Sequence, residues 1–187
     1  MLNVDDQRGG LTNNGFTLVE ILVVVAIIAI MSGLGIASYF RFLDRQRVYG
    51  AAMEAQVFLR DIQNRAKMGD RGDGVCATYS DAATVLSNRF DGWQVIFTGG
   101  TDIQARPVCS NGLGDAKTYV LPAQLRNRLQ IVGDTMVFPS LYGNVSAGAY
   151  SCVVVRDTNN PDLVFSFRVA AGGAISSLVD NGDCGGV

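Results

Sequence analysis

The chain has 187 residues, 48% of them hydrophobic, and a formal net charge of −2 at pH 7. With a pI near 5.0 it has no general attraction for nucleic acid or anionic lipid, so general nucleic-acid binding is not expected. It contains no histidine, the commonest general base, and no G-x-S-x-G or paired-carboxylate pattern stands out. We therefore expect neither an enzyme nor a bound cofactor.

The first feature along the chain is a polar segment, residues 1–15, that stops abruptly at an apolar run. From Phe16 to Phe40 the only charged residue is Glu20. A helix of about 20 apolar residues spans about 30 Å, the thickness of a bilayer's hydrocarbon core. Residues 16–40 are therefore predicted to form a transmembrane helix. The alternative is a cleaved secretory signal, for which residues 35–37 offer a small-x-small pattern, although such a signal has a shorter apolar core.

A six-residue motif lies at the start of this run, with the sequence Gly15-Phe16-Thr17-Leu18-Val19-Glu20. It resembles the processing motif of the type IV pilin superfamily, which includes pilins and the pseudopilins of type II secretion. In that family a prepilin peptidase cuts after the glycine on the cytoplasmic side and methylates the new N-terminus. The resemblance implies a leader peptide at residues 1–15, cleavage between Gly15 and Phe16, and N-methylation of Phe16.

Glu20 has two interpretations. Thr17 and Glu20 fit a capping box that simply starts a helix, and a carboxylate in the first turn gains from the helix dipole. This alternative leaves Gly15 and the abrupt change of polarity unexplained. The resemblance implies instead that Glu20 meets the Phe16 amine of a neighbouring subunit during filament assembly. A buried charge without its partner costs about 3 to 5 kcal/mol, so the correct axial register would be favoured.

Charges flanking the span give a conflicting indication of topology. Arg41, Arg45 and Arg47 follow it, and by lysine and arginine count alone the C-terminal domain would stay inside the cell. The resemblance implies export of that domain. We therefore expect a single-pass protein of the cytoplasmic (inner) membrane that enters an extracellular or periplasmic filament.

The helix is predicted to continue past the membrane as an amphipathic segment at residues 41–68. It would end at Gly69, giving one helix of about 50 residues and roughly 75 Å. A coiled-coil stalk is the alternative, but no strict heptad continues beyond Met68. Apolar residues recur at steps of three and four, namely Val48, Ala51, Ala52, Ala55, Phe58, Leu59, Ile62 and Ala66.

Residues 69–187 are predicted to form a β-rich globular head. Short β-prone runs alternate with Gly, Asn, Asp and Pro, and residues 163–169 alternate as a strand with one buried face requires. The predicted fold is α+β: a long N-terminal spine helix packed on a C-terminal antiparallel β domain, in one or two sheets, as in type IV pilins. The predicted strands are residues 92–97, 118–121, 135–138, 152–156, 163–169 and 174–178.

Four cysteines lie in the predicted head, and their even number favours disulfides in an oxidising compartment. Zinc is not expected, because no C-x-x-C pattern and no histidine are present. Three pairings are open; the shortest loops join Cys76 with Cys109 and Cys152 with Cys184.

Three further patterns have ordinary structural explanations. The Arg71-Gly72-Asp73 tripeptide, known from integrin ligands, is predicted to be a connector. A calcium site among residues 157–162, at Asp157, Asn159, Asn160 and Asp162, is the alternative to a simple turn. Trp93 and Phe97 are predicted to be core residues rather than a stacking site for a ligand.

The C-terminal half also looks loosely like the minor pseudopilin and FimT-like group, through the spacing of its apolar and glycine positions. The sequence thus favours a structural filament subunit, and within that class a minor one. The partners implied are the prepilin peptidase, other pilin or pseudopilin subunits, the pilus or secretion assembly platform, and the membrane. The alternative is a permanently membrane-anchored extracytoplasmic binding protein.

Overall fold

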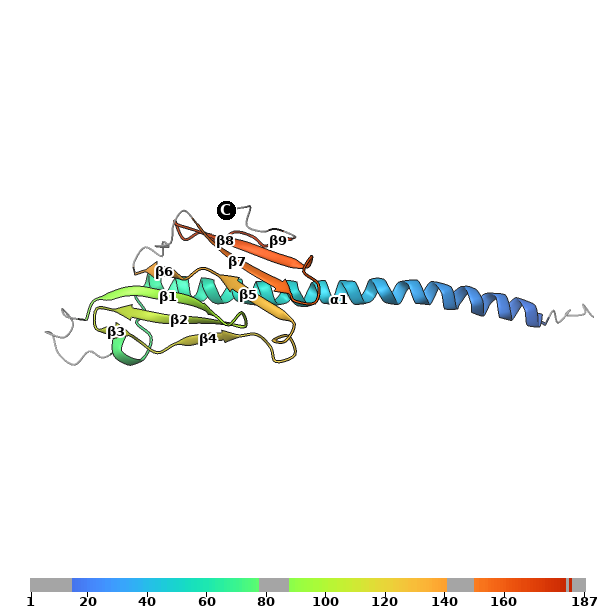
Figure 1. The fold of residues 1–187 in the computed structure, drawn as a ribbon, viewed down its shortest axis with the longest axis horizontal. Coiled ribbons are helices and arrows are strands. Elements are labelled where there is room, and N and C mark those ends of the chain that lie inside the picture. Colours follow the sequence, from blue (N-terminus) through green and yellow to red (C-terminus); the bar gives the residue numbers. More distant parts are fainter. Residues whose placement is uncertain (1–14, 78–87, 141–149, 181, 183–187) are drawn as a thin grey trace, which may run out of the picture. The chain divides into compact units, whose positions relative to one another are not determined.

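The computed structural model describes residues 15–77, 88–140, 150–180 and 182. Within them α1 (Leu18–Met68) is followed by the short 3-10 helix η1 (Gly74–Cys76) and by antiparallel strands (Figure 1). This is the α+β arrangement expected from the sequence. The chain divides into two compact units, Met1–Leu43 and Asp44–Val187. The second unit therefore comprises the C-terminal part of α1 together with the β-rich head.

The end of α1 is fixed by Gly69, which adopts a left-handed conformation with φ of 70°. The Gly69 N–H donates to the Ala66 carbonyl at 3.1 Å, and the Asp70 N–H donates to the Arg65 carbonyl at 2.9 Å. These two bonds form the Schellman pattern, which satisfies carbonyls that a helix end leaves open. The predicted helix end at Gly69 is confirmed.

The head-bearing part of α1, residues 44–68, buries one face against the strands. Every residue of the predicted apolar stripe except Phe58 is at most 3% exposed, and Phe58 is partly buried. Many of these side chains are alanines, which allow the helix to approach the sheets closely. The stripe therefore is the helix side of the head's core.

The first sheet has the strand order β3-β2-β1-β6, and β4 pairs with β2 beside β3. All of its pairs are antiparallel. Its strands are β1 (Phe90–Thr98), β2 (Asp102–Cys109), β3 (Gly112–Leu113), β4 (Lys117–Val120) and β6 (Met136–Pro139).

The second sheet has the order β5-β7-β8-β9. Its strands are β5 (Leu129–Gly133), β7 (Tyr150–Asp157), β8 (Val164–Ala170) and β9 (Val179–Asp180). The turn between β1 and β2 links the two sheets, because the Gly100 carbonyl accepts from the Ile131 N–H at 2.6 Å. Glycine is required at residue 100, since a Cβ there would lie 2.6 Å from Gln130 Cγ and φ is +77°.

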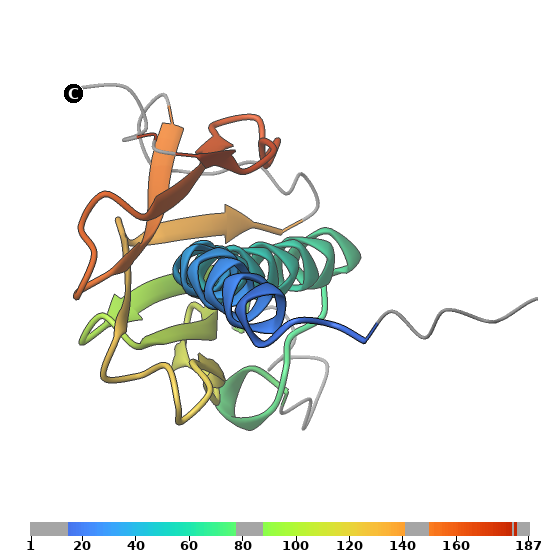
Figure 2. The same cartoon turned by 90° about the vertical axis from the view of Figure 1, so that its right-hand side faces the viewer.

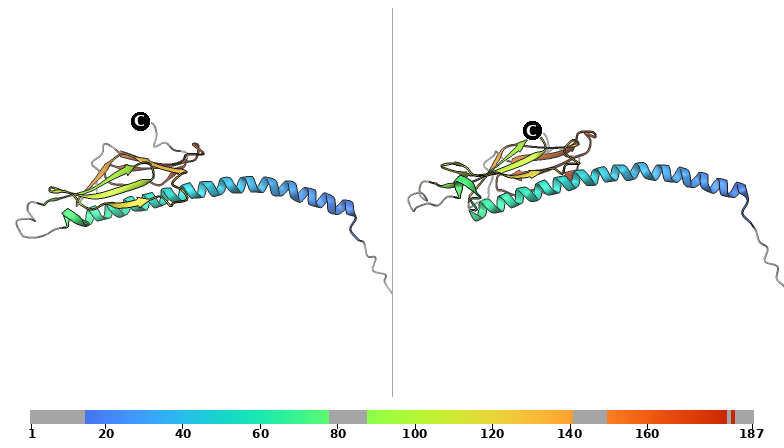
Figure 3. Two further views of the ribbon diagram at one scale, coloured as in Figure 1. Left: turned by 60° about the horizontal axis from the view of Figure 1, so that its bottom comes forward. Right: turned by 90° about the horizontal axis from the view of Figure 1, so that it is seen from below.

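Both sheets contact the head-bearing part of α1. The Tyr119 hydroxyl of β4 donates to Glu54 at 2.9 Å, and the Phe165 ring of β8 packs edge-on against Tyr49 with 5.5 Å between ring centroids. Burial, and then the Glu54 carboxylate, raise the pKa of Tyr119, so its hydroxyl remains a donor. Figure 2 shows the second sheet on one side of this helix segment and η1 on the other, and Figure 3 shows the strands running along it.

The predicted strand at residues 174–178 is wrong. Within this segment Ile175 alone forms a β-bridge, with Val169, and the last strand of the described chain is β9. The physical reason is that side chains of α1 bind backbone carbonyls in and just before this segment: the buried amides of Gln56 and Gln63 donate to the carbonyls of Ser176 and Gly173. None of the predicted strands covers β2, β3, β5 or β9.

Candidate processing and assembly site

The scissile bond predicted from the motif lies just outside the helix. Gly15, Phe16 and Thr17 are exposed and non-helical, and α1 begins at Leu18. The Phe16 side chain is 78% exposed. The Gly15–Phe16 peptide therefore lies outside the helix.

Glycine at residue 15 is not needed by the fold. A Cβ atom there would meet nothing within 4 Å, and Gly15 is not among the glycines with positive φ. Elsewhere in the chain the fold does demand glycine, as at Gly92, where φ is +145° and a Cβ would lie 2.1 Å from the Phe138 carbonyl oxygen. The glycine before Phe16 thus has no explanation within the described chain.

Thr17 and Glu20 form the first turn of α1. The Thr17 hydroxyl accepts from the Glu20 N–H at 3.2 Å, and the Thr17 carbonyl accepts from the Ile21 N–H at 3.3 Å. Thr17 is therefore the N-cap, as the capping-box interpretation expects. This cap uses the backbone of Glu20 and leaves its carboxylate exposed, with no ion pair to any residue that the structure describes.

The apolar stretch that follows has no protein covering. Its most apolar 18-residue window has a mean hydropathy of 2.6 and none of it is buried. Exposed fractions of 51% at Ile21, 61% at Leu22 and 51% at Ile27 illustrate this. Among the described residues α1 is the one helix long and apolar enough to cross a membrane. Exposed apolar surface on every side of a helix requires lipid or other helices around it.

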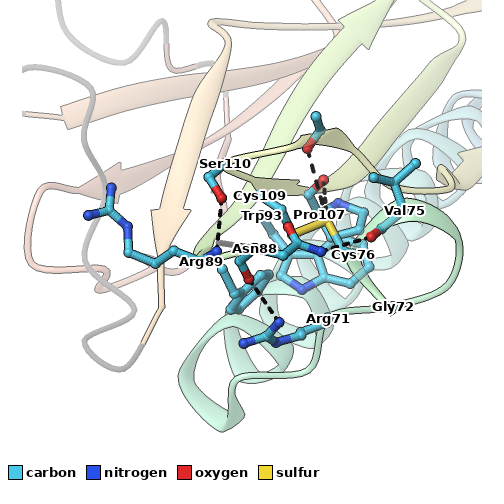
Figure 4. The surroundings of a disulfide bond; sticks show 12 residues. Arg71, Gly72, Val75, Cys76, Asn88, Arg89, Trp93, Pro107, Cys109 and Ser110 are labelled. Carbon is cyan, nitrogen blue, oxygen red and sulfur yellow. Dashed lines mark hydrogen bonds between the residues drawn. A yellow bond between two sulfur atoms is a disulfide. The ribbon is translucent and has the colours of Figure 1, made fainter. Parts of the chain in front are cut away.

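The cysteines belong to the other compact unit, Asp44–Val187. Cys76 is bonded to Cys109, with 5.8 Å between the Cα atoms, and this is one of the two shortest-loop pairs (Figure 4). Cys152 is also disulfide-bonded. Cys184, its partner in the shortest-loop scheme, lies outside the described residues.

Trp93 packs beside the Cys76–Cys109 bond and belongs to the core, with no exposed surface (Figure 4). Its indole N–H donates to the Asp70 carbonyl at 2.7 Å. A Cβ on Gly72, which has φ of +61°, would lie 3.1 Å from the Trp93 ring. Arg71 donates to the Asn88 carbonyl at 3.0 Å. Residues 71–73 are thus a connector between α1 and the first sheet.

We expect removal of the Cys76–Cys109 bond, as Cys76→Ala with Cys109→Ala, to lower the free energy of unfolding of the head by about 3 to 4 kcal/mol, because the bond closes a long loop. Urea titration of the full chain in detergent, followed by the fluorescence of Trp93, measures this, since Trp93 is the only tryptophan. An unchanged midpoint would contradict the prediction.

Among the four candidate calcium ligands, the Asp157 side chain is engaged in other contacts. The Asp157 carboxylate is buried, accepts from Arg128 Nε at 2.9 Å, and accepts from the Asn159 N–H at 2.9 Å. The Asn160 carbonyl accepts from the Leu163 N–H at 3.0 Å, which closes the turn between β7 and β8. The segment forms a turn pinned by an ion pair.

Sequence reasoning missed the ion-pair network around Arg128. Arg128 Nη2 lies 2.8 Å from Asp44 Oδ2, so one guanidinium joins the head-bearing helix to the buried Asp157. Arg47 also pairs with Asp44, and Arg45 pairs with Asp180. Arg47 and Asp44 are three residues apart on the helix, but no local signal could have revealed the pairs of Arg128 and Arg45, because their partners are far apart in the sequence.

Arg128 holds the pKa of Asp44 below its ordinary value of 3.8, first through their hydrogen bond. A lowered folded-state pKa contributes stability above the unfolded pKa, and that stability is lost as pH falls through the folded value. We expect Asp44→Asn to lower the melting temperature at about pH 7, with the difference from wild type shrinking below about pH 4. Melting curves at both pH values test this; a difference that persists unchanged in acid would contradict it.

The described chain thus consists of a helix that is long and apolar enough to cross a membrane and of an α+β head that contains a disulfide. The family model described as the prokaryotic N-terminal methylation motif matches residues 11–36. This motif marks the type IV pilin and pseudopilin family, so the chain carries the N-terminal signature of that family. No curated protein and no solved structure matches the chain. The motif indicates a structural subunit that is anchored in the membrane, is processed by a prepilin peptidase and assembles with other pilin subunits.

Proposed function

We propose that the chain is a filament subunit, a pilin or pseudopilin of a type IV pilus or type II secretion pseudopilus, matured by cleavage between Gly15 and Phe16 and by methylation of Phe16. The observation that carries this proposal is the glycine itself. The fold gives it open space and an ordinary backbone conformation, so no described contact calls for glycine there. A peptidase that excludes side chains at this position would account for it.

The apolar part of α1 supports assembly as the second step. Its surface is bare on all sides, which suits a lipid bilayer before assembly and a bundle of like helices afterwards. Cleavage creates an amine at Phe16, four residues before Glu20. In the bundle, the Glu20 carboxylate of one subunit pairs with the Phe16 amine of its neighbour.

The head is exported and forms the filament surface, with the assembly platform acting at the membrane. Two observations support export. The head carries disulfides, which persist in oxidising compartments. Arg45 and Arg47, which argue against export by charge count, are ion-paired within the folded head. The loose likeness of the C-terminal half to minor pseudopilins favours a low-abundance subunit.

Co-production with a prepilin peptidase tests the maturation step. The wild-type chain should lose residues 1–15, whereas Gly15→Leu should remain uncut. Gly10→Leu is the matched control, because it makes the same substitution five residues upstream and should be cut normally. Cleavage of Gly15→Leu at the wild-type rate, or no cleavage of the wild type, would overturn the proposal and leave a permanently anchored protein.

A further inference from the structure

A polar groove of about 360 Å³ lies between the head-bearing part of α1 and the turn that follows β8. Its helix side is formed by Arg60, Gln63, Asn64 and Lys67, whose spacings place them on one helix face. Its other side is the glycine-containing turn, where a Cβ on Gly172 would meet nothing within 4 Å. The groove is therefore open to a ligand from outside.

This groove carries two positive charges. Arg60 and Lys67 are exposed and lie about 10 Å apart along the helix. Neither makes an ion pair with any residue that the structure describes, because the nearby carboxylate of Asp61 is held by Arg65 Nε at 2.9 Å. The Gln63 side chain donates a hydrogen bond to the Gly173 carbonyl, which holds the turn after β8 against the helix. A local charge of +2 in a chain of net charge −2 fits a ligand with two carboxylates.

The same chain presents such a pair. Asp73 and Asp115 are exposed, and the Asp115 N–H donates to the Asp73 carbonyl at 3.1 Å, which holds the two residues side by side next to η1. The Asp115 carboxylate lies against η1: its Oδ1 atom is 2.8 Å from the position that a Cβ atom on Gly74 would occupy. Within the described ranges neither carboxylate has an ion-pair partner.

The other carboxylates of the head fit less well. Most already hold an arginine, as Asp157 and Asp180 do. The exposed carboxylates of Asp134 and Asp162 stand singly, in the turns after β5 and β7. Among the described residues, Asp73 and Asp115 are the two exposed aspartates that lie side by side without an ion-pair partner.

The two surfaces lie on different sides of the head. Figures 1 and 2 place η1 on one side of the head-bearing helix and the turn after β8 on the other. A contact between them cannot be made within one copy, and between copies it is heterologous, the kind that repeats along a filament. We propose that Arg60 and Lys67 of one copy bind Asp73 and Asp115 of a second copy, side to side. This rests on the proposed filament function, and it requires that two copies of this chain lie next to each other in the filament.

Zero-length carbodiimide coupling tests the contact in intact cells. The reagent condenses an amine with a carboxylate at ion-pair distance, and takes up the water that is lost. Lys67 and Lys117 are the only lysines. Two full-length variants are co-produced: Lys67→Arg, which lacks the amine, and Asp73→Asn with Asp115→Asn, which lacks both carboxylates. Any peptide that links Lys67 to Asp73 or Asp115 then joins two copies.

We expect this linked peptide in membranes or filaments that contain both variants. Lys67→Glu should reduce filament incorporation, and adding Asp115→Lys should restore it by reversing the pair. Arg156→Glu is the matched control, because Arg156 is an exposed arginine at the end of β7 that bonds to Gln130 and belongs to neither proposed surface. Absence of the linked peptide, or failure of the reversal to restore incorporation, would overturn the contact. The proposed function fails separately, because cleavage at Gly15 is read in the same samples.

Discussion

Glu20→Ala is expected to be cleaved normally and to enter filaments at less than about a tenth of the wild-type level. In the packed bundle the alanine leaves the Phe16 amine of a neighbour without a partner, and an unpaired buried charge costs about 3 to 5 kcal/mol, more than one factor of ten. The cap at Thr17 uses only the backbone of Glu20, so the helix should still start at Leu18. Immunoblots of sheared filaments against total membranes measure the ratio.

The matched control for this variant is Ile27→Ala, which removes an exposed side chain from the same apolar stretch without changing charge. It should be incorporated far better than Glu20→Ala. Wild-type incorporation of Glu20→Ala would show that Glu20 serves only the helix N-terminus, as the capping interpretation holds.

Arg128→Met is expected to lower the free energy of unfolding of the head by about 3 to 5 kcal/mol, because it leaves the buried Asp157 carboxylate without its cation. The partly exposed partner gives a contrast: Asp44→Asn should cost about 1 kcal/mol, since water reaches that side of the pair and screens it. Urea titrations followed by Trp93 fluorescence measure both variants.

A double variant separates this charge effect from lost packing. Arg128→Met combined with Asp157→Asn leaves no unpaired carboxylate in the core. Its loss in free energy of unfolding should therefore be smaller, by about 1 kcal/mol or more, than the sum of the losses in the two single variants. Strict additivity would show that Arg128 and Asp157 act independently, and would contradict the role of this ion pair.

The features that could be predicted from the sequence are those encoded locally. The motif at residues 15–20 needs no tertiary context, because its residues are consecutive and act at a helix start. The stripe from Val48 to Ala66 follows from helical periodicity, and Gly69 follows from helix-end chemistry. All of these signals lie within a few residues of what they specify.

Strand β2 shows where local signals mislead. Its residues alternate between half-buried and buried along all of Asp102–Cys109, as a half-buried strand should. Ala105 and Pro107 disfavour strands, so residue composition alone does not predict this strand. Pro107 is tolerated because it lies between the β2–β4 and β2–β3 ladders, where β2 pairs with β1 alone.

The remaining misses depend on contacts across the fold. Residues 174–178 have the composition of a strand, but Gln56 and Gln63 of α1 take up carbonyls of the neighbouring segment. Arg128 likewise acquires its role only when α1 brings Asp44 beside β5 and the end of β7. The groove of Arg60 and Lys67 also exists only after the turn following β8 packs on the helix.

The most direct test of the central claim is quantitative mass spectrometry of the N-terminal peptide that begins at Phe16, in sheared surface filaments and in the membrane fraction. A filament subunit predicts a methylated Phe16 peptide in the filaments, at trace level if the subunit is a minor one. An abundant methylated peptide would support the filament function but would show that the chain is a major subunit and not a minor one. An intact residue 1–15 leader in both fractions would contradict the filament function.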